Sequence, residues 1–434
     1  MTPRGGAETR ALWSSRPLAE RLALLRRFRR ALAVAPGPIL AALAQAIPGR
    51  NATETLTAEI LPLADACRFL ETEAEAILAP RRPGNVGKPF WLGRIDLEFH
   101  REPRGVVLLL GPANYPLLLP GVQALQALAA GNAVRLKPGR GARPVALALR
   151  NLLVSVGLAP ELFEVMGEEV EPIRAMLHSP TEAPDLVILT GSTETGRALL
   201  ADLASAPRPI PAILELSGRD GVFVLPGATP ADLDRAAQAI RFGRALNGGA
   251  TCIAPRRLFV PRALARELAE RLGALGEPSA PSGDAALEIH EVADLEEALA
   301  LDAACPFALG ASVFGPEEAA RELAGRLNAG TVVINDMIVP TADPRLPFGA
   351  RGASGFGVTR GAEGLLEMTV GKALAIRRGR FVPHLAGARA ADAPIFSALL
   401  GAVHGGGRAR WRAWFDLFRA MVLAAGRPTG KELQ

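Results

Sequence analysis

Apolar residues return with a helical period near the beginning of the chain. Between residues 17 and 33, leucine and phenylalanine recur every three to four positions, and arginines occupy the positions between them. This spacing predicts an amphipathic helix at the surface of a domain. A second helix is expected over residues 55–77, and the run of prolines and glycines over residues 80–89 ends it.

The middle of the chain repeats one pattern three times: a short apolar run, a turn that contains glycine or proline, and a helical segment. Short apolar runs of this kind are typical of strands buried on both faces of a parallel sheet. The three runs are residues 106–110, 133–136 and 186–189. The pattern predicts a doubly wound α/β domain, in which ligands bind at the turns that follow the strands.

Further strands are expected on both sides of this region. Residues 95–100 alternate apolar and charged side chains, as a half-exposed strand does. A second α/β region is predicted from Gly218 to about Thr369, with strands near residues 222–225, 257–260, 309–314 and 331–334. The long uncharged stretch over residues 105–134 contains prolines and polar amides, which argue against a membrane-spanning helix.

Charge is distributed unevenly along the chain. The net charge is +5, but residues 377–434 hold ten basic and three acidic residues, so the tail carries +7 and the preceding body −2. No segment outside the tail interleaves aromatic and arginine side chains, so nucleic acid is not an expected partner. Three cysteines form neither a disulfide framework nor a paired metal spacing. Together with the lack of an apolar signal sequence, they predict a cytoplasmic protein without a metal site.

Three residues are candidates for chemistry on a carbonyl group. Cys252 ends the segment N-G-G-A-T-C, where a thiolate could attack a carbonyl carbon, although a lone cysteine is more often an inert buried side chain. Glu215 ends an apolar run, where burial would suit it to act as a general base, or it is a solvated strand end. Asn114 could donate its amide to an oxyanion or only stabilise its own turn.

Two further features could bind a phosphate. Lys137, one of four lysines against 45 arginines, follows an apolar strand and could reach a hydroxyl or phosphate, unless it is an ordinary surface lysine. The segment from Gly191 to Gly196 opens a helix after a strand, which suits a phosphate, but helix capping by Ser192 explains it equally well. The dinucleotide fingerprint G-x-G-x-x-G is absent from these turns.

Taken together, these segments resemble the aldehyde dehydrogenase superfamily. In chain order they read G-P-A-N-Y-P, L-K-P, L-T-G-S-T-E-T-G-R, L-E-L-S-G and N-G-G-A-T-C-I-A-P, which is that family's own order. Residues 328–335 and 346–357 match the family's later segments, and the resemblance covers roughly residues 11–380. The glutamate and cysteine motifs are specific to the family.

The resemblance implies a fold and an assembly. It predicts a Rossmann-type, doubly wound NAD(P)-binding domain over residues 1–216 and a shortened α/β catalytic domain over residues 217–376. Residues 93–103 are expected to form a bridging β-hairpin, through which two subunits make a homodimer. Residues 377–434 form a basic, amphipathic C-terminal tail.

The resemblance also implies a reaction, in which an aldehyde, expected to be apolar, is oxidised to the acid. Cys252 would attack the aldehyde, while the Asn114 amide and the Cys252 backbone N–H stabilise the oxyanion. Hydride transfer to NAD or NADP would leave a thioester, which water activated by Glu215 would hydrolyse. The residues expected to bind the cofactor are Pro112, Lys137, Arg140, Gly191, Ser192, Gly196 and Leu216.

The chain departs from the family pattern at two places. The family's E-x-F-G-P motif, which holds the nicotinamide end of the cofactor, is missing between Cys252 and Asp294, and the run of residues 281–286 offers no substitute. A degenerate relative with a binding or scaffold role, or other acyl chemistry, is therefore an alternative to an active enzyme. Arg140 stands where a carboxylate often binds the ribose of NAD, which favours NADP.

The C-terminal tail shows a separate amphipathic pattern of aromatic and arginine side chains. Over residues 408–425, arginines lie beside or opposite an apolar stripe, which suits a helix in an anionic membrane interface. Packing against the body or a second subunit is the other interpretation. The stripe consists of Trp411, Trp414, Phe415, Phe418, Met421 and Val422.

Overall fold

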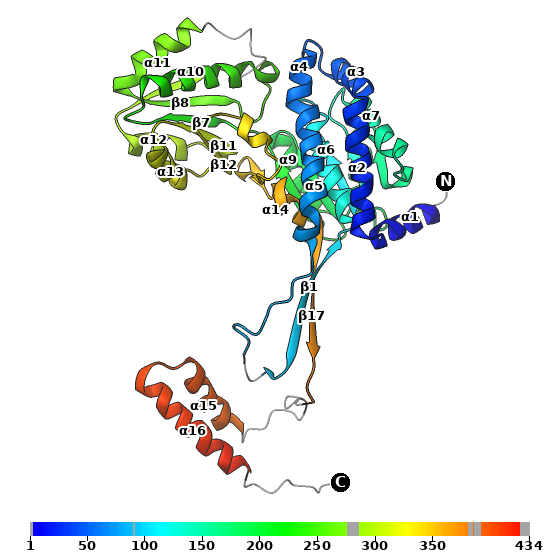
Figure 1. Cartoon of the computed structure of the whole chain (residues 1–434), viewed down its shortest axis with the longest axis vertical. Helices are drawn as coiled ribbons and strands as arrows, with labels where there is room; N and C mark the ends of the chain where they lie inside the picture. The colour runs from blue at the N-terminus through cyan, green and yellow to red at the C-terminus, as the bar shows by residue number, and fades with distance from the viewer. Residues whose placement is uncertain (1–2, 90–91, 276–285, 381–384, 386–391, 426–434) are drawn as a thin grey trace. The chain divides into compact units, whose positions relative to one another are not determined.

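The computed structural model describes residues 3–89, 92–275, 286–380, 385 and 392–425 (Figure 1). The chain divides into two compact units. The larger unit contains Met1–Arg81 and Phe99–Ala373, and the smaller one contains Arg82–Glu98 and Leu374–Gln434. Both predicted α/β regions lie in the larger unit, and the domain boundaries at residues 216 and 376 stay predictions.

The first α/β region is built on a six-stranded sheet with the order β15-β6-β5-β2-β3-β4. Five strands run parallel, and β15 pairs antiparallel with β6 at the edge. The doubly wound arrangement expected from the repeated apolar runs is confirmed. The strands are β2 (Val106–Leu110), β3 (Ala133–Lys137), β4 (Phe163–Val165), β5 (Leu186–Thr190), β6 (Ala212–Glu215) and β15 (Gly355–Phe356).

Helix α6 explains the long uncharged stretch of the sequence. All 13 of its residues, Leu118–Ala130, are buried, because it lies between the sheet and the N-terminal helices. Among the described residues, no helix is long and apolar enough to cross a membrane. The helices around this sheet are α1 (Pro3–Ser15), α2 (Leu18–Val34), α3 (Gly37–Ala46), α5 (Leu61–Leu78), α7 (Arg143–Ser155), α8 (Glu171–Leu177) and α9 (Thr193–Ala204).

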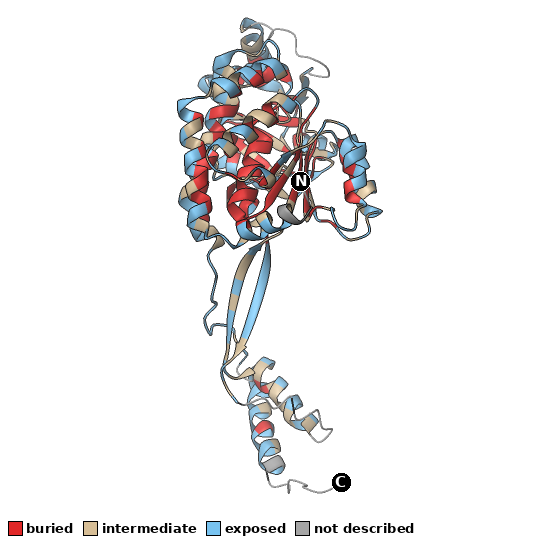
Figure 2. Ribbon diagram, turned by 90° about the vertical axis from the view of Figure 1, so that its right-hand side faces the viewer, coloured by how far each residue is buried: buried red, intermediate tan, exposed pale blue. Residues whose placement is uncertain are grey.

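The second α/β region contains a five-stranded parallel sheet with the order β12-β11-β7-β8-β9. Helices cover both of its faces, and separate apolar clusters fill the two layers (Figures 1 and 2). The strands are β7 (Asp220–Val224), β8 (Pro255–Pro261), β9 (Glu288–Val292), β11 (Gly310–Phe314) and β12 (Thr331–Ile334). The helices are α10 (Pro230–Ala245), α11 (Arg262–Ala274), α12 (Leu295–Ala303) and α13 (Glu317–Arg326).

Two long strands form a ribbon of their own. Strand β1 (Ile95–Pro103) pairs with β17 (Thr369–Arg377), so the ribbon joins parts of the chain that are far apart in sequence. Most of the side chains of β17 are exposed. The alternating pattern of residues 95–100 predicted β1. The bridging hairpin expected over residues 93–103 is not formed there, because β1 runs through these residues as a single strand and its partner β17 follows helix α14 (Gly361–Glu367), far along the chain.

The smaller unit contains a helical hairpin. Helix α15 (Ala393–His404) packs against α16 (Gly407–Ala425), and the buried side chains between them are Ala402 and Leu417. The aromatic stripe of residues 408–425 correctly predicted α16. The apolar segment before it, which carried no helical prediction, forms α15.

The expected helix over residues 55–77 begins earlier and is irregular. Helix α4 (Ala52–Thr55) continues into a π-helical turn, Leu56–Ile60, before α5 begins. This turn contains Glu59, which is fully buried beside the equally buried Arg50. The second carboxylate oxygen of Glu59 accepts hydrogen bonds from the backbone N–H groups of Leu117 (2.7 Å) and Leu118 (3.0 Å), where α6 begins. One carboxylate thus joins three segments of the chain.

We predict that Glu59→Ala lowers the free energy of unfolding by about 3–5 kcal/mol, because the buried Arg50 and two N–H groups lose their partner. Urea denaturation measures the change. Glu270→Ala, which breaks an exposed pair with Arg266, is the matched control and should cost less than about 1 kcal/mol. Equal losses in the two variants would contradict an anchoring role for Glu59.

Candidate functional site

Two turns from different parts of the larger unit meet at the candidate site. One follows β2 and carries Asn114, and the other follows α10 and carries Cys252. The Asn114 side-chain amide donates to the Ala250 carbonyl oxygen (2.6 Å), and the Asn247 amide donates to the Asn114 carbonyl oxygen (2.9 Å). The hydroxyls of Tyr115 and Thr251 share a hydrogen bond of 2.7 Å. These contacts fix the cysteine loop against the turn after β2.

The segment N-G-G before the cysteine adopts a backbone conformation that asparagine and glycine tolerate best. Asn247, Gly248 and Gly249 all have positive φ angles, of 53°, 59° and 78°, which glycine and asparagine tolerate best. The backbone N–H of Asn247 donates to the Glu54 carboxylate (2.6 Å), and its side-chain oxygen accepts from Arg50 (3.3 Å). The glycine pair therefore shapes the loop that carries Cys252.

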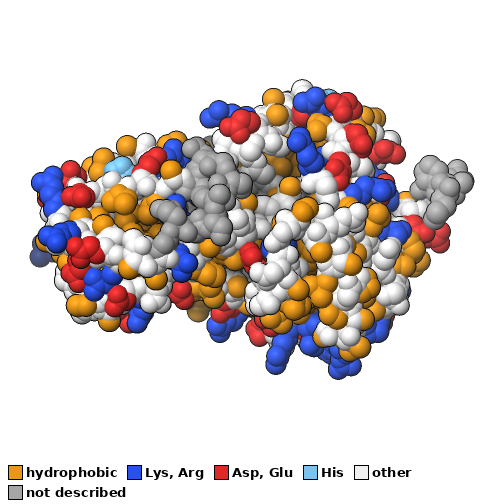
Figure 3. All heavy atoms as spheres, turned by 90° about the horizontal axis from the view of Figure 1, so that it is seen from above, with side chains coloured by type: hydrophobic (Ala, Val, Ile, Leu, Met, Phe, Trp, Pro, Cys, Tyr) orange, Lys and Arg blue, Asp and Glu red, His pale blue; other side chains and the backbone are white. Residues whose placement is uncertain are grey.

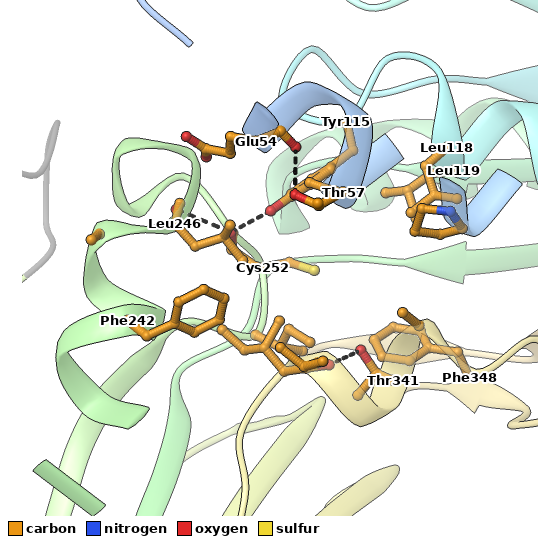
Figure 4. A pocket seen from close by; sticks show the side chains of 18 of the residues that line it. Glu54, Thr57, Tyr115, Leu118, Leu119, Phe242, Leu246, Cys252, Thr341 and Phe348 are labelled. Carbon is orange, nitrogen blue, oxygen red and sulfur yellow. Dashed lines mark hydrogen bonds between the residues drawn. The ribbon is translucent and has the colours of Figure 1, made fainter. Parts of the chain in front are cut away.

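Cys252 borders a cavity of about 800 Å³. Figure 4 shows its sulfur directed between the side chains of Leu118 and Leu119 on one side and Thr341 and Phe348 on the other. Most of the lining side chains are apolar, and further examples are Phe242, Leu246 and Ile253. The polar exceptions include Glu54, Thr57, Thr341 and Arg360.

The surroundings of Cys252 favour its neutral thiol. Burial raises the pKa of Cys252 to about 12, and the negative charges of Asp220 and Glu215 raise it as well, while Arg360 acts in the opposite direction. Burial also raises the pKa of Asp220, to about 7. The thiol therefore needs a base before it can act as a nucleophile.

Glu215 lies at the end of β6 and is buried. Burial raises the pKa of its carboxyl group, although Arg360 and two threonine hydroxyls favour the carboxylate. One oxygen accepts from the Thr359 hydroxyl and the other from Thr190 (3.3 Å), whose own hydroxyl accepts from Gln123 (3.3 Å). Glu215 is thus within electrostatic range of Cys252, but it is not among the residues that line the cavity.

Sequence analysis missed Thr359 and Arg360. The pairing of Gly355 with Glu215 brings the turn after β15 to the end of β6. A Cβ atom at Gly355 would lie 2.0 Å from the Leu214 carbonyl oxygen, so only glycine fits this approach. Arg360 stacks over Phe348 at 4.6 Å and donates to the Thr341 carbonyl oxygen (2.7 Å). No local pattern marks these residues, because their position depends on the pairing of β15 with β6 and on the pairing of Thr359 with Phe348.

A separate cleft of about 240 Å³ lies at the carboxyl ends of β2, β3 and β5. Three of the residues predicted to bind a cofactor, Pro112, Lys137 and Gly191, line it. The Lys137 ammonium donates to the Pro138 carbonyl oxygen (3.1 Å), and burial lowers the pKa of Lys137. Ser192 caps α9 at this edge by accepting from the Thr195 N–H (3.2 Å). A cation and a helix N-terminus beside one cleft fit the phosphates of a dinucleotide.

The remaining predicted cofactor residues lie outside the lining of this cleft. A Cβ atom at Gly196 would lie 2.6 Å from Leu216, so glycine at this position allows α9 to pack closely on the segment after β6. Arg140 is exposed and does not line the cleft. Most of the run of residues 281–286 falls outside the described residues.

Comparisons with known proteins agree with these observations. The family model described as "Aldehyde dehydrogenase family" matches residues 5–279 and 286–374. A relative from Methylomonas sp, named 4,4'-diapolycopene aldehyde oxidase, is 29% identical over 385 residues, which cover 74% of this chain and 71% of the relative.

Two solved structures share the fold. An aldehyde dehydrogenase from Mycobacterium tuberculosis complexed with NAD+ has a TM-score of 0.74 at 22% identity and covers 85% of this chain and 88% of that one. The NADP-dependent glyceraldehyde-3-phosphate dehydrogenase from Bacillus halodurans, complexed with NADP, has a TM-score of 0.76 at 24% identity. The match covers 86% of this chain and 90% of that one. The expected resemblance and the expected fold are confirmed.

We predict that Cys252 alkylates slowly near neutral pH and that its rate rises about tenfold per pH unit without a plateau below pH 10, because only the thiolate reacts. Iodoacetamide labelling followed by peptide mass spectrometry measures it. Arg360→Gln should slow the reaction, because it removes a cation that lowers the pKa of Cys252, and Asp220→Asn should accelerate it. A plateau near pH 8, or the opposite order of the variants, would contradict the assigned electrostatics.

Proposed function

Because the chain belongs to the aldehyde dehydrogenase family, we propose that it oxidises an apolar aldehyde to the carboxylic acid with NAD or NADP as the hydride acceptor. The observation that carries this proposal is the position of Cys252 on a large cavity with mainly apolar walls. Ligand cavities commonly range from about 300 to 1,000 Å³, so this one suits a bulky substrate. The relative named 4,4'-diapolycopene aldehyde oxidase also supports an aldehyde as substrate.

The first step is the attack of the Cys252 sulfur on the aldehyde carbon, which gives a tetrahedral adduct. Since the thiol has a raised pKa, a base must take its proton, and Glu215 is the carboxylate assigned to this task. One N–H of the Asn114 amide is bound to Ala250, and its second N–H is assigned to the developing oxyanion together with the Cys252 backbone N–H.

Pro112, Lys137, Gly191 and Ser192 are assigned to the nucleotide part of the cofactor, since they lie in or beside the cleft at the sheet edge. Gly196 and Leu216 are assigned to shaping that edge, and Arg140 to a 2′-phosphate, which favours NADP. A nicotinamide held there would supply the acceptor for the hydride that leaves the substrate carbon as the oxyanion collapses to a thioester on Cys252.

Hydrolysis then releases the acid. Glu215 first releases the thiol's proton to solvent, and its carboxylate then removes a proton from a water molecule, so that the hydroxide attacks the acyl carbon bound to the Cys252 sulfur. The carbon–sulfur bond breaks, the sulfur regains a proton, and the carboxylic acid leaves. The hydroxyls of Thr359 and Thr190 hold the carboxylate of Glu215 between these steps.

We also propose that two chains form a homodimer through the β1–β17 ribbon. Among the described residues, the outer edge of β17 pairs with no further strand, and the outer edge of β1 is paired only at Phe99, with Arg81; such edges readily accept another strand. The family resemblance favours the same region.

We predict that Cys252→Ser lowers the rate of NAD(P)H formation by at least about 1,000-fold, because a hydroxyl is a far weaker nucleophile than a thiolate. Glu215→Gln should lower kcat by about 100- to 10,000-fold, as expected for loss of a general base. Absorbance at 340 nm with a series of aldehydes measures both effects. An unchanged cofactor-induced rise in Tm controls for folding, and retained turnover in Cys252→Ser would contradict the role of this residue.

Cofactor choice is tested by Arg140→Glu. This variant should raise the KM for NADP by about 10- to 100-fold, because it removes a charge-assisted hydrogen bond, and leave the KM for NAD nearly unchanged. Arg241→Glu, on α10, is the matched control for a loss of positive charge elsewhere. Equal changes for the two cofactors would remove Arg140 from its assigned contact.

A further inference from the structure

Helix α16 presents a band of large apolar side chains to solvent. Trp411 is 78% exposed, Phe415 75% and Phe418 70%. Trp414, Met421 and Val422 of the same stripe are also exposed. Figure 2 shows the hairpin mostly in tan and pale blue. Contiguous apolar surface of this kind normally marks a site of interaction.

The aromatic side chains are not needed to hold the hairpin together. Small residues make the contact between α15 and α16, since a Cβ atom at Gly401 would lie 2.8 Å from that of Ala413. The buried residues are Ala402 and Leu417, and Arg410 donates to the Ala402 carbonyl oxygen (3.2 Å). The aromatic stripe is therefore available for a partner outside the hairpin.

The charges beside the stripe identify the kind of partner. Helix α16 contains four arginines and one acidic residue, Asp416. On a helical wheel, Arg408, Arg412 and Arg419 lie together along one border of the stripe, and all three are exposed. By contrast, acidic and basic side chains are intermixed on the face shown in Figure 3. A second copy of the hairpin would bring a further excess of arginine, whereas anionic lipid headgroups would neutralise it.

We propose that α16 lies in the interface of an anionic lipid bilayer, with its aromatic stripe among the upper acyl chains and its arginines at the headgroups. Its 19 residues span about 28 Å, enough for a helix lying parallel to the surface. Indole and phenyl rings partition favourably into this zone. No described helix can cross a membrane, so the association is peripheral. This proposal is independent of the proposed function.

Vesicle flotation of the full chain tests it. The wild-type chain should float with vesicles of phosphatidylcholine and phosphatidylglycerol. It should bind vesicles of pure phosphatidylcholine at least about tenfold more weakly, because each arginine near an anionic surface strengthens binding. The variant Trp411→Ser/Phe415→Ser/Phe418→Ser should lose binding to both. The variant Arg408→Gln/Arg412→Gln/Arg419→Gln should bind anionic vesicles about tenfold or more weakly than the wild type, and its binding to pure phosphatidylcholine should not change.

A matched control distinguishes this result from nonspecific hydrophobic adsorption to vesicles. The variant Leu12→Ser/Val34→Ser/Val86→Ser removes three exposed apolar side chains outside the tail and should float like the wild type. Far-ultraviolet circular dichroism checks that the helices persist. The proposal is overturned if the wild type stays with the pellet, if all variants float equally, or if the aromatic variant only converts a dimer to a monomer without any vesicle binding by the wild type.

Discussion

The contact between the turn after β2 and the cysteine loop is the constraint on which the candidate site depends. Three hydrogen bonds, made by the side chains of Asn114, Asn247 and the pair Tyr115 and Thr251, hold these two segments together. They join the six-stranded sheet to the segment that leads into the five-stranded sheet. These hydrogen bonds hold the loop that places the Cys252 sulfur at the wall of the apolar cavity.

The half-buried cation Arg360 balances the negative charges near this wall. Burial disfavours both the carboxylate of Glu215 and the thiolate of Cys252, and each charge disfavours the other. Arg360 interacts favourably with both, and its own position is fixed by Phe348 and Thr341. The proposed reaction needs each anion in turn rather than both together, so one cation can serve two steps.

The sequence predicted three strands of the doubly wound sheet, β2, β3 and β5, because their mostly buried faces leave short apolar runs. Strand β9 was missed because its residues alternate and include exposed Glu288 and Ile289. The proximity of Asn114 and Cys252 followed from the family resemblance, and their roles stay predictions. The positive φ angles of Gly248 and Gly249 show that the glycines before Cys252 shape its loop, which the sequence motif alone did not reveal.

Contacts between distant segments could not be predicted in this way. The positions of Thr359 and Arg360 depend on the antiparallel pairing of β15 with β6. The burial of Glu59 depends on the irregular turn between α4 and α5 and on the N-terminus of α6. In both cases the decisive partner lies far along the chain, and no local period or motif records it.

We propose that Cys252 acts on an aldehyde whose apolar part fills the cavity. The dependence of kcat/KM on the length of unbranched aldehydes, with NADP in excess, tests this claim most directly. The account predicts a rise of about three- to fourfold for each added methylene, since each buried methylene contributes about 0.8 kcal/mol, until the cavity is filled. A kcat/KM that is independent of chain length, or highest for the shortest aldehyde, would contradict it.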